Sequence, residues 1–340
     1  MTFEAQGFPV RYGTGMVADL VDRLDSYVVV TQPEPWAVVA PSLEHHPAEV
    51  VLAGDLSPEH LDHLTRDVRQ VGAIVAIGGG SAMDTGKWLH WRRQVPLYSV
   101  PSLPSVNACF TRMTALRDRG GVRYDGDAVP EEVLVDFDLM RSAPAELLRG
   151  GIGDVLSCHT AHFDWALAVE RGHDPPWDEH AAAMSQIYLD ELADLCPQLR
   201  DLTDAGLRRL MELHRDIGWR CHDLGHARFE EGSEHFFAYA FEEVTGRTIM
   251  HGELVALGVL IMSALQDNRP ERARAIVNSS GMRSTPSELG VADAEIDAAL
   301  RRLRSHVHEH GLWYSIANEL EIGDSELAAA HRAVDARNLE

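Results

Sequence analysis

The sequence has 340 residues, of which 45% are hydrophobic and 24% charged, a length and composition typical of a globular protein with a large core and more than one domain. Its formal net charge of −23 argues against a nucleic-acid partner, because binding to phosphate backbones requires a basic surface. The four cysteines form no CxxC pair and no apolar run reaches the roughly 18–20 residues of a membrane span, so we expect a cytoplasmic protein with reduced thiols and no membrane partner.

Short apolar runs alternate with helical segments up to about residue 140. The predicted strands are 27–31, 37–40, 50–52, 73–77, 97–100 and 133–136, and a helix is predicted from Ser57 to Val71. The strands lack polar alternation and are separated by helices. They therefore predict a parallel sheet covered on both faces.

A glycine-rich loop follows the predicted strand 73–77. Gly78, Gly79 and Gly80 lead directly into a helix that begins near Ser81 and contains Lys87, the only lysine of the chain. Glycines let a backbone approach closely, and the free N–H groups at a helix start attract a pyrophosphate. The loop therefore indicates a dinucleotide site, although it is not a GxGxxG fingerprint and a plain strand-to-helix turn is the alternative.

Two further loops bear on that site. Gln32 follows the strand 27–31, at the position where an acidic residue favours NAD. A glutamine there does not repel the extra phosphate of NADP. NAD and NADP therefore both stay open as the cofactor. Ser102, Ser105 and Asn107 follow the strand 97–100 at its carboxyl end, where ligands of open parallel sheets bind. These three side chains contact cofactor or substrate, or they are solvated loop residues.

A local basic cluster comes next in this acidic chain. Its members surround Gly120 and Gly121 and are Arg112, Arg117, Arg119 and Arg123. The cluster is either an anion-binding site or a surface hairpin.

From Pro144 onward the sequence is typical of helices. The predicted helices are 154–169, 181–195, 204–224, 233–244, 250–265, 293–310 and 324–337. We therefore expect two domains, an N-terminal Rossmann-like, dinucleotide-binding α/β domain over residues 1–143 and an all-helical, metal-binding domain over residues 144–340.

Two histidines of the helical half border glycines and apolar helices. His235 lies in the first turn of the predicted helix 233–244, and His251 lies in the first turn of the helix 250–265. Histidines on two antiparallel helices can each place a ring nitrogen about 2.0–2.1 Å from one shared divalent ion. Asp154, after a glycine run, is the best candidate for a third ligand. Three protein ligands leave a position free for water or substrate, which is typical of a catalytic site. The alternative is that these are ordinary surface or core histidines, of which the chain has eighteen in all.

These motifs together resemble a known family. Gly78-Gly-Gly-Ser-Ala-Met-Asp-Thr-Gly-Lys87 is similar to the GGGSxxDxxK loop of the iron-containing alcohol dehydrogenase and dehydroquinate synthase-like superfamily. Gly151-Ile-Gly-Asp-Val-Leu-Ser157, Glu231-Gly-Ser-Glu-His235 and His251-Gly-Glu253 resemble most the glycerol-1-phosphate dehydrogenase branch. Asn107 is a departure, because relatives usually carry aspartate at this position, which is thought to contact substrate.

The resemblance implies a dehydroquinate synthase-like fold, a homodimer or larger assembly, and one divalent metal ion. The metal ligands are then Asp154, His235 and His251, with Zn²⁺ expected first and iron or nickel as alternatives. The residues expected at the cofactor are Gly78, Gly79, Gly80, Ser81, Asp84, Lys87, Ser102 and Ser105.

We therefore expect hydride transfer between NAD(P) and a small polyol phosphate or related hydroxy compound. A metal bound to the substrate oxygen lowers the pKa of the hydroxyl and orients the carbon towards the nicotinamide. The expected catalytic residues are the three metal ligands and Asn107, at the position thought to contact substrate. His162 is a candidate proton relay, and the alternative is an ordinary core or surface histidine. Two alternatives stay open, namely a metal- and NAD-dependent cyclase of the dehydroquinate synthase type with no net redox change, and a nucleotide-binding protein that has lost its catalysis.

Overall fold

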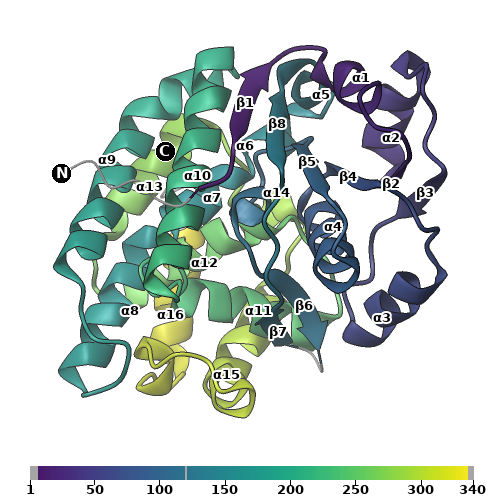
Figure 1. The fold of residues 1–340 in the computed structure, drawn as a ribbon. Coiled ribbons are helices and arrows are strands. Elements are labelled where there is room, and N and C mark those ends of the chain that lie inside the picture. Colours follow the sequence, from purple (N-terminus) through teal and green to yellow (C-terminus); the bar gives the residue numbers. More distant parts are fainter. Residues whose placement is uncertain (1–6, 119–120, 336–340) are drawn as a thin grey trace. The chain divides into compact units, whose positions relative to one another are not determined.

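The computed structural model describes residues 7–118 and 121–335 of the chain (Figure 1). Contacts between Cα atoms divide the chain into two units. Unit 1 comprises Met1–Leu148 with His214–Asp223, and unit 2 comprises Arg149–Leu213 with Leu224–Glu340. The first boundary therefore lies a few residues after the predicted 143/144, and one helix, α10, contributes to both units.

Unit 1 is built on a six-stranded parallel sheet with the strand order β1-β8-β5-β4-β2-β3. These strands are β1 Val10–Gly13, β2 Tyr27–Thr31, β3 Glu49–Leu52, β4 Ala73–Gly78, β5 Leu97–Pro101 and β8 Glu132–Asp136. A separate antiparallel hairpin joins β6 Thr114–Asp118 to β7 Gly121–Asp125. The central strands β2 and β4 are buried along their whole length, as expected for a sheet covered on both faces.

Helices supply two hydrophobic clusters in unit 1. The helices and 3₁₀ turns are α1 Met16–Val21, α2 Pro33–Val39, η1 Ala40–Ser42, α3 Pro58–Asp67, α4 Gly80–Arg93, η2 Asn107–Phe110, α5 Phe137–Arg141 and α6 Ala145–Arg149, the last of which reaches into unit 2. One cluster joins α1, α2 and α5 to the sheet, with Leu20, Val39 and Leu139 among its members. The other joins α3, α4 and β6 through Leu61, Trp88 and Leu116. The predicted parallel sheet is therefore confirmed.

The prediction of a strand at 37–40 was wrong, because these residues belong to α2 and the following 3₁₀ turn. Pro33 stands at the start of α2, where its fixed φ favours a helix, and a four-residue apolar run does not distinguish strand from helix. The helix predicted from Ser57 to Val71 ends at Asp67. β1 was missed.

The basic cluster lies on the hairpin and its flanks. Arg112 forms an ion pair with Asp127, and Arg123 lies 3.5 Å from Asp125. Arg119 lies outside the described residues. These acidic neighbours favour the surface-hairpin alternative over an anion site.

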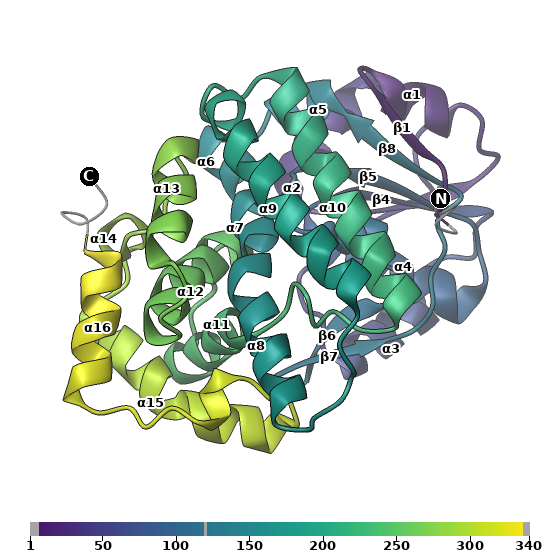
Figure 2. The ribbon, with the colours of Figure 1, turned by 90° about the vertical axis from the view of Figure 1, so that its left-hand side faces the viewer.

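The described residues of unit 2 form helices joined by loops, with no strand among them, as predicted. Its helices and 3₁₀ turn are α7 Gly151–Leu156, α8 Cys158–Glu170, α9 Glu179–Arg200, α10 Asp204–Leu224 (in part), α11 Ser233–Thr245, α12 His251–Leu265, α13 Pro270–Ser280, α14 Pro286–Leu289, α15 Asp293–His310, η3 Ile316–Asn318 and α16 Asp324–Val334. Figure 2 shows α12 among α11, α13 and α16, and it packs on all three. Every residue of α12 from Gly252 to Ser263 is buried, which agrees with its almost entirely apolar sequence.

One predicted helix of unit 2, 154–169, is two helices that meet at Ser157. The Ser157 hydroxyl lies 2.6 Å from the carbonyl oxygen of Asp154 and 2.5 Å from that of Glu230. A serine that hydrogen-bonds to backbone carbonyls competes with the helical ladder. The helix is interrupted at Ser157, and α7, which carries Asp154, ends just before it. Residues 336–337, at the end of the last predicted helix, lie outside the described residues.

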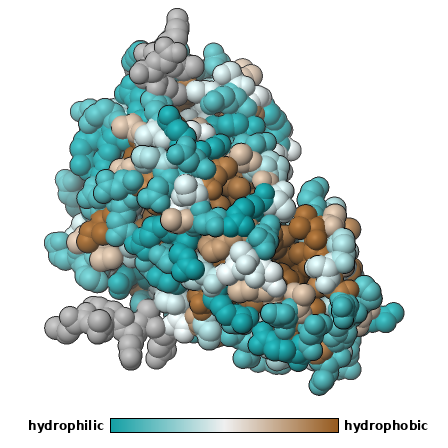
Figure 3. Space-filling model, turned by 90° about the horizontal axis from the view of Figure 1, so that it is seen from above, coloured by the Kyte–Doolittle hydropathy of each residue, from teal (hydrophilic) through white to brown (hydrophobic). Residues whose placement is uncertain are grey.

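Hydrophilic residues dominate the face drawn in Figure 3, with hydrophobic residues in small groups between them. This distribution agrees with the net charge of −23. None of the helices in the described part of the chain has both the length and the apolar character needed to cross a membrane.

A buried histidine of α8 makes the stability depend on pH. His159 is 2% exposed and its Nε2 lies 2.7 Å from the carbonyl oxygen of Asn268. Burial lowers the pKa of His159 from 6.5 to about 4. Between these two pH values the unfolded chain binds a proton that the folded chain does not, so stability decreases as pH falls from 6.5 to 4, by roughly 3 kcal/mol. Urea unfolding at several pH values should show a shallower pH dependence for His159→Gln than for the wild type, and parallel curves would contradict this assignment.

Candidate active site

The glycine loop of unit 1 connects β4 to α4. Gly78 has φ +154°, and a Cβ there would lie 1.9 Å from Oε1 of Gln32 and 2.9 Å from Cβ of Ala82. A Cβ on Gly80 would lie 3.1 Å from Val106. The loop therefore requires glycine at position 78, and the start of α4 offers backbone N–H groups to an anion.

Gln32 lies against this loop. Its Nε2 donates to Oγ of Ser81 at 2.7 Å, and the N–H of Gly79 donates to its Oε1 at 3.2 Å. The structure thus brings the residue at the tip of β2 together with the first turn of α4, as the predicted dinucleotide site requires. The roles of Gly78 to Ser81 in holding NAD(P) stay predictions.

Asp84 and Lys87 lie one turn apart on α4, and both are buried. The Lys87 ammonium lies 2.8 Å from Oδ1 of Asp84 and donates to Oγ1 of Thr111 at 3.1 Å and to the carbonyl of Met113 at 2.6 Å. Asp84 also accepts the N–H of Ala115 at 3.2 Å. Three acceptors around one nitrogen explain why a compact ammonium suits this position better than a guanidinium. These contacts indicate that Asp84 and Lys87 hold the helix α4 in place behind the glycine loop. Their predicted direct contact with the cofactor stays a prediction.

Removing this buried ammonium should destabilise the protein strongly. Lys87→Met leaves Asp84 buried without its partner, for which we expect a loss of about 3–5 kcal/mol in the free energy of unfolding. The control is Asp62→Asn, which breaks the exposed Arg92–Asp62 pair at 2.8 Å and should cost less than about 1 kcal/mol. Urea unfolding of both variants measures the difference. Equal losses would show that burial of the Lys87 pair is unimportant.

The other unit 1 residues lie on the loop after β5. Ser102 and Ser105 are buried, and the N–H of Ser102 donates to the carbonyl of Gly78 at 2.9 Å. Asn107 begins η2 and is half-buried. Ser102 is therefore next to the glycine loop, and the roles of Ser105 and Asn107 stay predictions.

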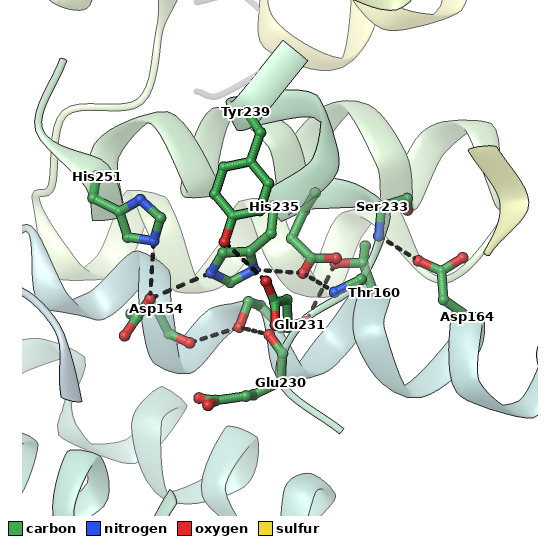
Figure 4. A network of polar contacts seen from close by, with 12 residues as sticks. Asp154, Thr160, Asp164, Glu230, Glu231, Ser233, His235, Tyr239 and His251 are labelled. Carbon is green, nitrogen blue, oxygen red and sulfur yellow. Dashed lines mark hydrogen bonds and ion pairs between the residues drawn. The ribbon is translucent and has the colours of Figure 1, made fainter. Parts of the chain in front are cut away.

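In unit 2 the three predicted metal ligands come together (Figure 4). Nε2 of His235 and Nε2 of His251 each lie 3.5 Å from Oδ1 of Asp154. One ligand atom from each residue lies within 4.8 Å of the other two. The side chains of Asp154 and His235 are 8% exposed, whereas His251 is 25% exposed, so the cluster is closed on one side and accessible on the other.

Glycines allow the helices that carry the ligands to meet. A Cβ on Gly153 of α7 would lie 1.8 Å from the carbonyl oxygen of Gly252, and a Cβ on Gly252 would lie 1.9 Å from that of Gly150. The backbones of α7 and α12 are therefore in direct contact. This contact brings Asp154, beside Gly153, to His251, beside Gly252.

A carboxylate holds the ring of His235. Nδ1 of His235 lies 2.8 Å from Oε1 of Glu234, which also accepts the N–H of Gly232 at 2.7 Å. Thr160 donates to the other carboxylate oxygen at 2.7 Å. Because Nδ1 of His235 contacts Glu234, the Nε2 of the same ring faces Asp154. Nε2 is therefore the nitrogen that is placed to ligate a metal.

Electrostatics favour a positive charge at this cluster. Burial alone lowers the pKa of His235, but Asp154 and Glu234 outweigh burial and raise the pKa well above 6.5. Two imidazoles and one carboxylate are a donor set that suits Zn²⁺, and iron or nickel also accept it. The residues present therefore fit a divalent metal.

Asp164 fixes the start of α11. It accepts the N–H of Ser233 at 2.7 Å and the N–H of Ile316 at 2.8 Å. Burial raises the pKa of Asp164 to about 6, with a smaller contribution from Glu234. The roles of Glu234, Thr160 and Asp164 were not identified from the sequence; of these, only Glu234 lies inside a motif quoted above.

The contacts of His162, the candidate proton relay, are with residues other than the three predicted metal ligands. Its Nδ1 lies 3.1 Å from Oγ of Ser185, and its ring packs edge-on against Trp177. Burial lowers its pKa. These contacts give the relay role no support.

The comparisons with known proteins agree with this geometry. The model of the iron-containing alcohol dehydrogenase family matches residues 27–144. An NAD(P)+-linked glycerol-1-phosphate dehydrogenase of Thermoplasma volcanium is 29% identical, with 94% of this chain and 92% of that protein covered, and one of Hyperthermus butylicus is 28% identical, with 90% and 91% covered.

Among solved structures, a probable glycerol dehydrogenase from Sinorhizobium meliloti 1021 superposes with a TM-score of 0.72 at 18% identity, covering 98% of this chain and 96% of that one. The glycerol dehydrogenase from Schizosaccharomyces pombe gives a TM-score of 0.70 at 20% identity, covering 97% and 90%. The fold is thus that of the glycerol dehydrogenases. Over residues 27–144 the chain is similar to the iron-containing alcohol dehydrogenase family.

Proposed function

We propose that the protein is a metal-dependent, NAD(P)-linked dehydrogenase that transfers a hydride to or from a hydroxyl-bearing carbon of a small polyol phosphate or related hydroxy compound. The observation that carries this proposal is the convergence of Asp154, His235 and His251, whose ligand atoms all lie within 4.8 Å of one another. Similarity to glycerol-1-phosphate dehydrogenases over more than 90% of the chain supports the substrate class.

Asp154, His235 and His251 would hold the metal, and each has a distinct part. A bound divalent cation supplies Lewis acidity that makes a substrate hydroxyl more acidic or a carbonyl more electrophilic. Asp154 would offset part of the positive charge, and Glu234, which lies 2.8 Å from Nδ1 of His235, would orient the ring with Nε2 towards the metal. The partly exposed edge of His251 leaves the side from which a substrate oxygen can approach.

In unit 1 the glycine loop would hold the pyrophosphate of the coenzyme. Gln32 already contacts Gly79 and Ser81 at this loop, and its neutral amide is compatible with NAD and with NADP. The identity of the metal, the choice between NAD and NADP, the homodimer or larger assembly and the cytoplasmic location stay predictions.

The test is a panel of polyols and their phosphates, with the corresponding ketones, assayed with NAD and with NADP. We expect steady formation or consumption of NAD(P)H with at least one substrate, and loss of this activity when a chelator removes the metal. Inorganic phosphate release without net change in NAD(P)H would instead support the cyclase alternative and contradict the proposal.

A further inference from the structure

A second cluster of metal-ligating side chains lies at the end of α11 remote from His235. Glu243 belongs to the last turn of α11, and His306 and His310 belong to the last turns of α15. The two helices pack on each other within unit 2 (Figures 1 and 2). One ligand atom from each of the three residues lies within 4.8 Å of the other two.

The two histidines present one face of α15 to Glu243. They are four residues apart, so their side chains are neighbours on the helix, and their ring centroids are 4.4 Å apart. Nδ1 of His306 lies 2.7 Å from Oε2 of Glu243. The His306 side chain is fully buried, and its Nε2 has no hydrogen-bond partner within the described part of the chain. A buried nitrogen without a partner is rare and calls for a ligand or a water.

The charges around the cluster favour a cation. Arg302 contacts Glu243 and Glu309 through both oxygens of each, so one guanidinium faces two carboxylates and the group retains one negative charge. α11 and α15 both end here, and the carbonyls at a helix C-terminus carry partial negative charge. The last turn of α11 contains no basic residue, and that of α15 contains only His308 and His310 as basic residues.

We propose that Glu243, His306 and His310 form a second divalent-cation site, separate from the Asp154 cluster and not required for the dehydrogenase reaction. Imidazole and carboxylate ligands suit Zn²⁺ and its neighbours nickel and copper. Glu243 turns to the cation while Arg302 keeps Glu309 as its partner. The ion links the end of α11 to α15, and α11 carries His235 at its start.

Zinc counting tests this site without reference to activity. Metal is removed from the full-length protein with a chelator. The protein is then dialysed against buffered Zn²⁺ at about pH 7.5, and bound zinc is measured by mass spectrometry. We expect two equivalents in the wild type, one in His310→Gln, one in His251→Gln and none in the double variant. His310 is half-buried, so its replacement is tolerated more readily than that of His306.

Thermal unfolding provides the second readout. Zn²⁺ should raise the Tm of His251→Gln, in which only the second site remains, and should leave the Tm of the double variant unchanged. His308→Gln, on the exposed face of the same helix, is the matched control and should retain both equivalents. If His310→Gln does not fold, Glu243→Gln, at an exposed residue, takes its place. The same zinc content in the wild type and in His310→Gln, whether one or two equivalents, would overturn the proposal.

Discussion

Replacing His251 by alanine is expected to remove the catalytic metal and to lower kcat/KM by about a thousandfold or more. A metal contributes several kcal/mol of transition-state stabilisation, and each 1.36 kcal/mol corresponds to about tenfold in rate. His235→Ala should have the same effect, because both rings approach the same oxygen of Asp154 at 3.5 Å. Metal content by mass spectrometry and kcat/KM with the best substrate of the panel measure the two losses together.

The matched control is His162→Gln, which replaces a histidine of α8 whose ring packs on Trp177 and hydrogen-bonds to Ser185. It should retain its metal and most of its turnover. A large loss in His162→Gln with the metal still bound would revive the proton-relay role. Full metal content and full turnover in His235→Ala and in His251→Ala would refute the ligand assignment.

Glu234→Gln is expected to weaken metal binding by about 10–100-fold without removing a ligand, the range found when a carboxylate that orients a ligating histidine is lost. Glu234 accepts from His235, Gly232 and Thr160, and an amide has only one oxygen with which to replace these three interactions. The ring of His235 therefore loses the partner that fixes its tautomer and orientation. Competition with a chromophoric chelator of known affinity measures the change.

A control on the same helix separates this effect from a general loss of charge. Glu242→Gln removes one negative charge from a half-buried position of α11 and should leave metal affinity within about twofold of the wild type, because a partly exposed charge is screened. If the two variants bind metal equally well, Glu234 does not position His235. If Glu234→Gln loses metal altogether and also unfolds, its role is structural, and that outcome contradicts the positioning role as well.

The sequence predicted those parts of the site that a local pattern of residues indicates. A histidine in the first turn of an apolar helix, repeated on a second helix, indicated His235 and His251. Three glycines after a buried strand indicated the loop at 78–80. The conformational demand at Gly78 and the backbone contact between Gly153 and Gly252 explain why these positions are glycine.

The parts that were missed depend on partners distant in the sequence. The role of Glu234 was missed, because its bond to Thr160 requires the packing of α8 on α11. The interruption between α7 and α8 at Ser157 involves a distant partner in the same way, the carbonyl of Glu230. The error at 37–40 has a local cause, since a short apolar run fits a strand as well as a helix until the preceding prolines are weighed.

If Asp154, His235 and His251 bind one divalent ion, anomalous diffraction from crystals of the metal-loaded protein will locate it between them. We expect a peak about 2.0–2.2 Å from a carboxylate oxygen of Asp154 and from Nε2 of both histidines. A fully loaded, active protein whose anomalous peak lies away from these three side chains would contradict this assignment.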